Sequence, residues 1–335
     1  MSLNSVLLTG GTGSLGASVL AQLLSNGNNV TAVVRSLKKS APFLTRQYAP
    51  QVDSGKLKLV EVPDMTVPHA FDDLVKTVDA IVHVATPLSN SDFQRTIIDA
   101  TLAINDNIFA ASLQAPSVKR IIITGSIVST MALPDVLFRP ITVSADDYST
   151  ITNEQGLSTL PAAYQYAKTS SEKKAWEFMK TAKPSFDLVV LLAPSITGKC
   201  IQEGFVPSKT ALGGMADIYQ NVLDVETPGL VFPFVMDVED VASIHVKSLD
   251  LKVPGNERYL FHSGHPQNSS EVAKKTREEY PQLRNRVPKV LDESAESPVK
   301  VKVDTSKSDK VFPGPWKDWW ESAKDTVDDI VKFEK

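Results

Sequence analysis

The chain has 335 residues, of which 42% are hydrophobic and 22% charged, and its formal net charge is −4. This composition is typical of a globular protein and excludes collagen-like, low-complexity and strongly charged disordered chains. Charges of both signs are mixed along the sequence, so we expect no basic face for a nucleic acid.

The sequence also limits the compartment that we expect. Cys200 is the single cysteine, so no disulfide can form within this chain. The first apolar run, residues 6–8, is too short for a signal peptide, and no run approaches the ~18 apolar residues of a membrane span. We therefore expect a cytoplasmic protein without a membrane partner, acting as a monomer or a homodimer.

Short apolar runs alternate with amphipathic stretches in the first half of the chain. The runs are mostly apolar throughout, which is typical of strands covered by helices on both faces. The repeated β-α units predict an α/β fold, a Rossmann doubly wound parallel sheet. The predicted strands are residues 6–8, 30–34, 57–62, 80–85, 120–124 and 188–192, and the first predicted helix is 14–25.

The strand–helix rhythm fades after Pro194, where glycine, proline and serine become frequent. Helices are still predicted over residues 239–251 and 270–280 and after Pro315. We expect residues 1–194, with 235–255 returning to them, to form the NADP-binding Rossmann domain. Residues 195–234 and 256–335 would then form a smaller, less regular substrate-binding lobe.

A glycine-rich run lies between the first predicted strand and the first predicted helix. Side chains at Gly10, Gly13 and Gly16 would keep the backbone from a pyrophosphate or hold the helix off the strand. The N–H groups and the positive dipole end of the helix would face the phosphates. The spacing is GxxGxxG rather than GxGxxG, and a purely structural turn is the alternative. The predicted contacts here are Thr9, Gly10, Gly13, Ser14, Leu15 and Gly16.

The end of the second predicted strand indicates which dinucleotide would bind. An NAD site usually has an acidic residue there, but this chain has Arg35, followed by Lys38 and Lys39. A cation would pair with a 2′-phosphate, so NADPH is favoured over NADH. Arg35 is the best candidate and Lys39 a further one; a solvated basic loop is the alternative.

Two residues follow the third predicted strand directly, Asp64 and Met65. Asp64 is a candidate acceptor for the adenine amino group, and a turn aspartate is the equal alternative. We include both residues among the predicted cofactor contacts.

Tyr164 and Lys168 form a YxxxK pair. Residues four apart share one helix face, so the ammonium is expected to favour the phenolate and lower the tyrosine pKa. The tyrosine could then donate a proton to a carbonyl oxygen as hydride arrives, and Lys168 could also contact the cofactor by bonding the nicotinamide ribose. Ser126 follows the fifth predicted strand, at the edge where open α/β sheets bind ligands, and could hold that oxygen. A serine that caps a turn is the alternative.

Taken together, these motifs resemble the extended short-chain dehydrogenase/reductase family. Within it, the resemblance is to dihydroflavonol reductases and to yeast and fungal aldehyde and ketone reductases. The matching segments are residues 9–16, Arg35, 83–87, 124–126, 164–168, Pro194 and Ser195 with Gly198, 238–242 and 304–307. The resemblance implies a catalytic triad of Ser126, Tyr164 and Lys168. It also implies that Val84, Ala85 and Thr86 lie along the cofactor and that Pro194 and Ser195 line the nicotinamide.

The sequence departs from this family at three places. Gly125 stands where the branch often has a first serine, and Ile104 and Asn105 stand where a Gly-Thr pair is usual. Residues 199–233 match nothing that can be carried over, and they should line the substrate pocket. The candidate apolar walls are Phe205, Met215, Tyr219, Phe232 and Phe234.

The sequence therefore predicts an NADPH-dependent carbonyl reductase for aldehydes or ketones, reversible to an alcohol dehydrogenase, with Tyr164 as proton donor. Two alternatives stay open: an NADP-binding regulatory protein without activity, and an extended-family epimerase or hydroxysteroid dehydrogenase. No metal site is expected, because no His, Cys or acidic cluster has ligand spacing. The expected partner is a small carbonyl or alcohol substrate.

Overall fold

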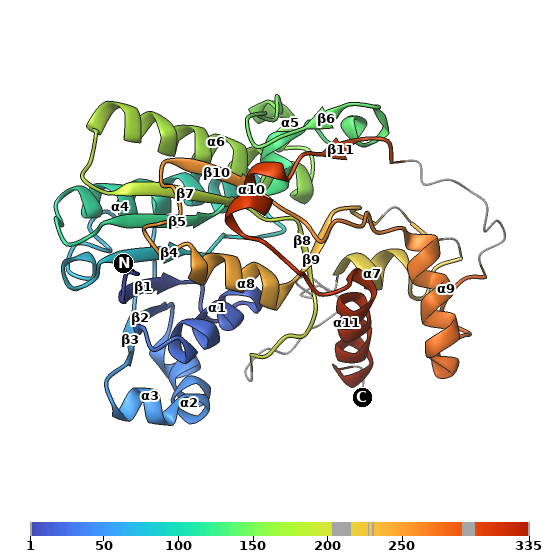
Figure 1. Ribbon diagram of the computed structural model, residues 1–335, viewed down its shortest axis with the longest axis horizontal. Helices are drawn as coiled ribbons and strands as arrows, with labels where there is room; N and C mark the ends of the chain where they lie inside the picture. Colours follow the sequence, from blue (N-terminus) through green and yellow to red (C-terminus); the bar gives the residue numbers. More distant parts are fainter. Residues whose placement is uncertain (1, 203–215, 227, 230, 290–298, 334–335) are drawn as a thin grey trace.

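The computed structural model describes residues 2–202, 216–226, 228–229, 231–289 and 299–333. Within them, the main sheet has seven parallel strands in the order β10-β7-β5-β4-β1-β2-β3 (Figure 1). This order reverses between β1 and β4, where doubly wound sheets bind their ligands. The strands are β1 (Ser5–Thr9), β2 (Asn29–Val34), β3 (Leu57–Glu61), β4 (Ala80–His83), β5 (Arg120–Thr124), β7 (Asp187–Leu192) and β10 (Glu257–Leu260).

The six strands predicted from apolar runs are all present, and the predicted Rossmann fold is confirmed. The seventh strand, β10, pairs in parallel with β7 and lies beyond residue 255, in the range expected for the smaller lobe. Two of its four residues, Glu257 and Arg258, are charged, so the pattern of a strand buried on both faces is interrupted before Tyr259 and Leu260. Arg258 is nonetheless buried, where it forms an ion pair with Glu172.

Helices cover both faces of the sheet, as the doubly apolar strands require (Figure 1). In β1, Val6 and Leu8 point into the core beneath α1 (Ser14–Ser25) and α8 (Val238–Lys247). Leu7 points into the opposite core, beneath α4 (Ala100–Leu113) and α6 (Leu160–Ala182). One turn of π-helix, residues 94–99, leads into α4.

The remaining elements are short or lie outside the main sheet. Two strand pairs, β6 (Thr142–Val143) with β11 (Lys302–Val303) and β8 (Ser195–Thr197) with β9 (Val235–Asp237), are parallel. The other helices are α2 (Leu37–Gln47), α3 (Ala49–Asp53), α5 (Asn153–Gly156), α7 (Ala216–Asn221), α9 (Ser269–Glu279), α10 (Ser306–Val311) and α11 (Trp319–Phe333).

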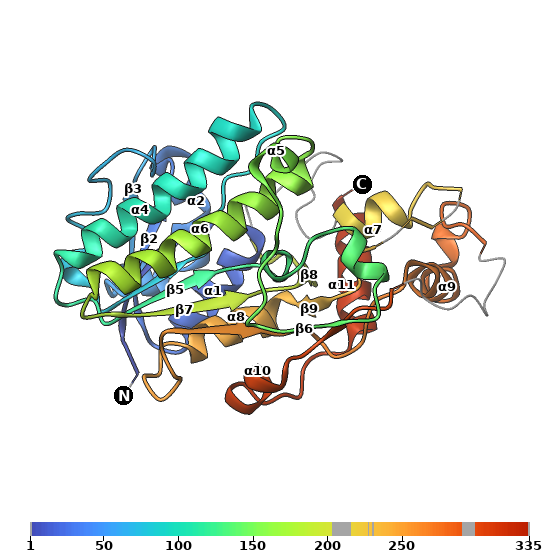
Figure 2. The same ribbon diagram turned by 90° about the horizontal axis from the view of Figure 1, so that it is seen from above.

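Helices α7, α9 and α11 gather beyond β8 and β9, past the end of the sheet at which β7 stops (Figure 2). Their apolar faces form a core of their own that includes Ile218, Val272 and Trp319. Helix α11 also holds the segment that follows β7 through three hydrogen bonds. These join Thr197 Oγ1 to Ser322 Oγ (2.6 Å), Gly198 N to Thr326 Oγ1 (2.9 Å) and Cys200 N to Asp329 Oδ2 (2.7 Å).

No helix in the described part of the chain is both long and apolar enough to cross a membrane.

Candidate active site and cofactor cleft

A cleft of about 760 Å³ opens at the carboxyl ends of β1, β4 and β5. It lies where the strand order reverses, as expected for a doubly wound sheet. Twelve residues predicted as cofactor contacts line it: Gly10, Gly13, Ser14, Leu15, Gly16, Arg35, Asp64, Met65, Val84, Ala85, Thr86 and Lys168.

The turn between β1 and α1 needs glycine for steric reasons. Gly10 has φ +78°, and a Cβ there would lie 2.7 Å from the backbone nitrogen of Ala85. A Cβ at Gly16 would lie 1.9 Å from the carbonyl oxygen of Gly10. Gly13 is the N-cap of α1 and provides no side-chain cap, so the amide groups of the first turn are available to an anion. These residues fit a dinucleotide diphosphate.

Four residues predicted to contact the cofactor do not line the cleft: Thr9, Lys39, Pro194 and Ser195. Thr9 is fully buried, and its hydroxyl accepts from Ala85 N (3.3 Å) and bonds His83 Nδ1 (2.7 Å). It therefore supports the floor of the cleft. Ile196 of β8 lines the cleft in place of its neighbour Ser195, since neighbouring residues of a strand face opposite sides. Lys39 is exposed on α2.

Arg35 and Asp64 lie on the rim of the cleft. Arg35 is exposed just after β2 and belongs to the lining. The Asp64 carboxylate accepts hydrogen bonds from Thr66 N (2.8 Å) and Thr66 Oγ1 (2.6 Å), which lower its pKa. Asp64 thus has the bonds of a turn aspartate and still lines the cleft.

The three predicted catalytic residues lie together. Tyr164 and Lys168 are one turn apart on α6, with the Lys168 Nζ 5.7 Å from the tyrosine ring centroid. The Ser126 hydroxyl hydrogen-bonds to Tyr164. The Lys168 ammonium donates to the carbonyl oxygen of Thr124 (2.7 Å) and to Thr86 Oγ1 (2.8 Å). Motif analysis missed the Thr124 carbonyl, since every residue type carries one.

Burial controls the protonation of this group. It lowers the pKa of Lys168 to about 8, and the nearby Glu172 carboxylate opposes that shift. It raises the pKa of Tyr164, while the hydrogen bond from Ser126 lowers it. The net shift of the Tyr164 pKa is therefore opposite to the predicted lowering, because desolvation outweighs the hydrogen bond from Ser126. At pH 7 the site holds a neutral phenol and a charged ammonium.

Two buried histidines flank the site in the neutral form. Burial lowers the pKa of His83 to about 3 and that of His245 to about 4. His245 Nδ1 donates to the carbonyl oxygen of Val241 (2.8 Å), so its Nε2 accepts from Thr124 Oγ1 (2.8 Å). His83 is thus a buried histidine of the core.

The structure accounts for two of the departures from the resembled family. A Cβ at Gly125 would lie 2.8 Å from Val190 Cγ1, so a serine would not fit against this strand. Asn105 is buried and hydrogen-bonds to His83. The unusual residue on α4 is thus paired with the histidine of β4.

A second cavity, of about 970 Å³, adjoins the cleft at Tyr164, which lines both. Its walls are mainly apolar and come from residues 128–139, 150–165 and Phe232. Phe232 is a predicted wall, whereas Tyr219 and Phe234 are buried in the cores. Phe205 and Met215 lie outside the described residues.

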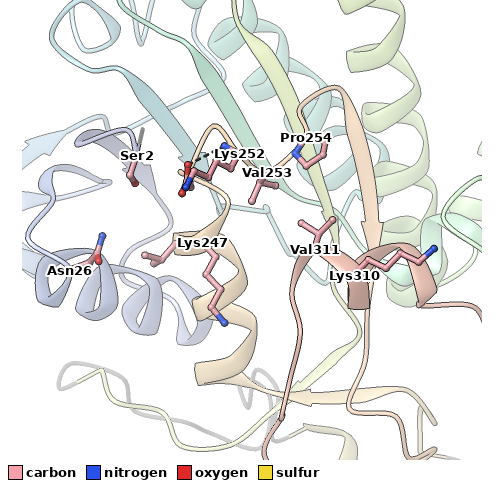
Figure 3. Close-up of a pocket in the computed structure, with 10 residues that line it drawn as sticks. Ser2, Asn26, Lys247, Lys252, Val253, Pro254, Lys310 and Val311 are labelled. Atoms are coloured by element: carbon pink, nitrogen blue, oxygen red, sulfur yellow. Dashed lines mark hydrogen bonds between the residues drawn. The ribbon is translucent and has the colours of Figure 1, made fainter.

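A third cavity, of about 540 Å³, lies near the start of β1, far from these groups along the strands. Three lysines line it, but Lys247 and Lys310 point away from each other (Figure 3). They do not converge on a ligand. Among the described residues there is also no group of His, Cys, Asp and Glu side chains that could hold a metal.

The sequence was compared with known protein families. Residues 6–260 match the NAD dependent epimerase/dehydratase family. The chain belongs to this family. Similar proteins include a putative NADPH-dependent methylglyoxal reductase of Candida albicans, 25% identical over 97% of this chain and 98% of that protein. A ketoreductase of Penicillium rubens is 30% identical over 78% of this chain and 76% of its own length.

The epimerase/dehydratase fold of this chain also resembles solved structures. The yeast methylglyoxal/isovaleraldehyde reductase Gre2, complexed with NADPH, superposes with a TM-score of 0.89. The two chains are 22% identical, and the match covers 98% of this chain and 99% of that one. At 22% identity, this likeness is evidence for the fold alone.

Proposed function

We propose that this protein is an NADPH-dependent carbonyl reductase, acting on aldehydes or ketones and reversible to an alcohol dehydrogenase. One observation carries the proposal: Tyr164 lines both the glycine-turn cleft and the adjoining apolar cavity. A proton donor in that position can reach a carbonyl held in the apolar cavity beside a dinucleotide held in the cleft.

Each residue of the triad has a distinct task in this scheme. Bound NADPH would supply hydride to the carbonyl carbon. The Ser126 hydroxyl would hydrogen-bond the carbonyl oxygen, and the Tyr164 phenol would give that oxygen its proton. The Lys168 ammonium, within 5.7 Å of the phenol ring, would stabilise the phenolate that remains.

The choice of NADPH rests on Arg35 and on the relatives. Arg35 stands where an acidic residue would bind the ribose of NAD, and a guanidinium suits a 2′-phosphate. A similar protein of Candida albicans is named a putative NADPH-dependent reductase. Arg35 also speaks against the epimerase alternative, and the presence of both Tyr164 and Lys168 speaks against a regulatory protein without activity.

The test compares NADPH and NADH side by side with purified protein and a panel of aldehydes and ketones, including methylglyoxal and isovaleraldehyde. We expect oxidation of NADPH that depends on the carbonyl compound, and slower oxidation of NADH. Absence of carbonyl-dependent oxidation across the panel would overturn the proposal.

The proposal also covers the site residues, the domain division, the assembly and the cellular location. We propose Ser126, Tyr164 and Lys168 as the catalytic residues. We propose the twelve predicted residues that line the cleft as its cofactor contacts. We also propose the division into a Rossmann domain and a smaller substrate lobe, extended to include β10 in the sheet. A cytoplasmic location is proposed because a single cysteine fits a reducing compartment. A monomer or a homodimer is proposed as the assembly. Size-exclusion chromatography and cell fractionation test the assembly and the location.

A further inference from the structure

A buried carboxylate lies one helical turn beyond the catalytic lysine. Glu172 follows Lys168 by four residues on α6 and is 4% exposed. Three side chains donate to it: Arg258 through Nε (2.5 Å) and Nη2 (3.3 Å), Ser129 Oγ (3.0 Å) and Trp176 Nε1 (3.2 Å). A carboxylate that accepts so many hydrogen bonds is fixed in place.

Arg258, on β10, connects Glu172 to the segment that precedes the apolar cavity. Its Nη1 donates to the carbonyl oxygens of Ala145 and Asp147, the latter at 2.8 Å. Its guanidinium carbon lies 3.8 Å from the ring centroid of Tyr148. The segment that it holds leads directly into residues 150–152, which line the apolar cavity.

Ser129 connects the same carboxylate to the turn that carries the catalytic serine. Its hydroxyl lies 2.7 Å from the carbonyl oxygen of Ser126 as well as 3.0 Å from Glu172 Oε2. Its own carbonyl oxygen accepts from Ser149 N (2.7 Å). Glu172 therefore joins α6, the Ser126 turn and the edge strand β10.

Glu172 also sets the charge around Lys168. The titratable groups that face Lys168 are Tyr164 and Glu172 from α6, His83 from β4 and His245 from α8. Both histidines are neutral at pH 7, so Glu172 provides the negative charge in this group. Arg258 reaches it from β10 through Glu172. Lys168 and Glu172 line one small cavity beneath the active site.

We propose that Glu172 and Arg258 are a positioning pair for hydride transfer, in which Glu172 keeps Lys168 charged and Arg258 fixes both Glu172 and the substrate-facing segment. The inference rests on the proposed reductase function. Glu172 and Arg258 would act through the Ser-Tyr-Lys triad and would not touch the substrate themselves.

The test is the pH dependence of kcat and kcat/KM for NADPH-dependent reduction of methylglyoxal. In Glu172→Gln the alkaline limb of the profile should move to lower pH by roughly half a unit or more, because Lys168 loses its anionic neighbour. Glu172→Asp keeps the charge on a shorter side chain. It should lower kcat yet leave the limb where the wild type has it.

The matched control is Asp106→Asn. Asp106 pairs with Lys174 of α6 (2.5 Å) on the protein surface, so its loss should leave the limb unchanged. If Glu172→Gln moves the limb no more than this control does, the inference fails. If the wild-type protein reduces no carbonyl compound, the proposed function fails instead.

Removing Glu172 alone leaves Arg258 buried without its partner, which can prevent folding. In that case Arg258→Met is compared with the double variant Glu172→Gln/Arg258→Met, since the two differ by the Glu172 charge alone. The limb of the double variant should lie at lower pH than that of Arg258→Met. Coincident limbs in these two variants would overturn the inference.

Discussion

The ammonium of Lys168 donates a 2.7 Å hydrogen bond to the carbonyl oxygen of Thr124, the last residue of β5. This bond fixes α6 to the carboxyl end of β5 through a backbone atom. The Thr124 side chain is engaged separately with His245. This arrangement holds Lys168 beside Tyr164 whatever residue occupies position 124.

Tyr164→Phe removes the proposed proton donor and little else. We expect kcat to fall by about 10²–10⁴-fold, while the affinity for NADPH stays within a few-fold of the wild type. Steady-state kinetics and a fluorescence titration with NADPH measure the two effects.

Tyr166→Phe is the matched control, because Tyr166 lies on the same helix and packs against Gly156 outside both cavities. It should keep its activity. Equal losses in the two variants would argue against Tyr164 as the donor.

Arg35→Ala should weaken NADPH binding by about 10–100-fold, the value of a charge-assisted contact of ~1.5–3 kcal/mol. NADH binding should change little, because NADH has no 2′-phosphate. Lys38→Ala, at an exposed position in the first turn of α2 and outside the cleft lining, provides the comparison. KM values for both dinucleotides decide the matter, and a parallel loss for NADH would contradict the role given to Arg35.

Two glycines of the turn should respond differently to alanine. At Gly16 the added Cβ would meet a backbone oxygen at 1.9 Å, so α1 must move away from β1. We expect Gly16→Ala to lower the free energy of unfolding by about 2–4 kcal/mol. Urea unfolding in the absence of NADPH measures this loss.

At Gly13 the added Cβ would lie 3.4 Å from the Gly10 oxygen, which is an ordinary contact, and φ is −93°. Gly13→Ala should therefore fold with wild-type stability but bind NADPH more weakly, since the methyl group would face the phosphates. A variant that binds normally would show that the phosphates lie elsewhere.

Stability should decrease as the solution becomes acidic. His83 and His245 have folded pKa values of about 3 and 4, below the ordinary 6.5, so the unfolded chain takes up their protons first. Each therefore costs up to about 1.4 kcal/mol of unfolding free energy per pH unit below ~6.5. Asp217, with its folded pKa raised to about 6, has the opposite sign and offsets part of this loss between pH 6 and 4.

Urea unfolding at pH 7 and pH 5 checks this dependence. His245→Asn should flatten it, whereas His69→Gln should leave it unchanged because the His69 side chain is 84% exposed. An identical slope in the His245 variant would indicate that other groups cause the acid sensitivity.

The apolar strands and the motifs at their ends were predictable because both depend on local sequence. Strands buried on two faces are apolar runs, and ligand residues follow them directly, as with Gly10 and Ser126. Strand β10 was not predictable, since Arg258 looks exposed until Glu172, 86 residues away, is placed beside it. The direction of the Tyr164 pKa shift depends on how deeply α6 is buried, which the YxxxK spacing does not contain.

The position of α11 after all strands of the main sheet affects when the cleft is completed during synthesis. The hydrogen bonds to Ser322, Thr326 and Asp329 hold the segment that runs from β8 past the edge of the cleft. On the ribosome, the whole main sheet has been translated before these residues appear. The cleft should therefore gain full affinity for its dinucleotide after α11 has been released, so a nascent chain arrested before residue 319 should carry a formed sheet that binds the dinucleotide weakly.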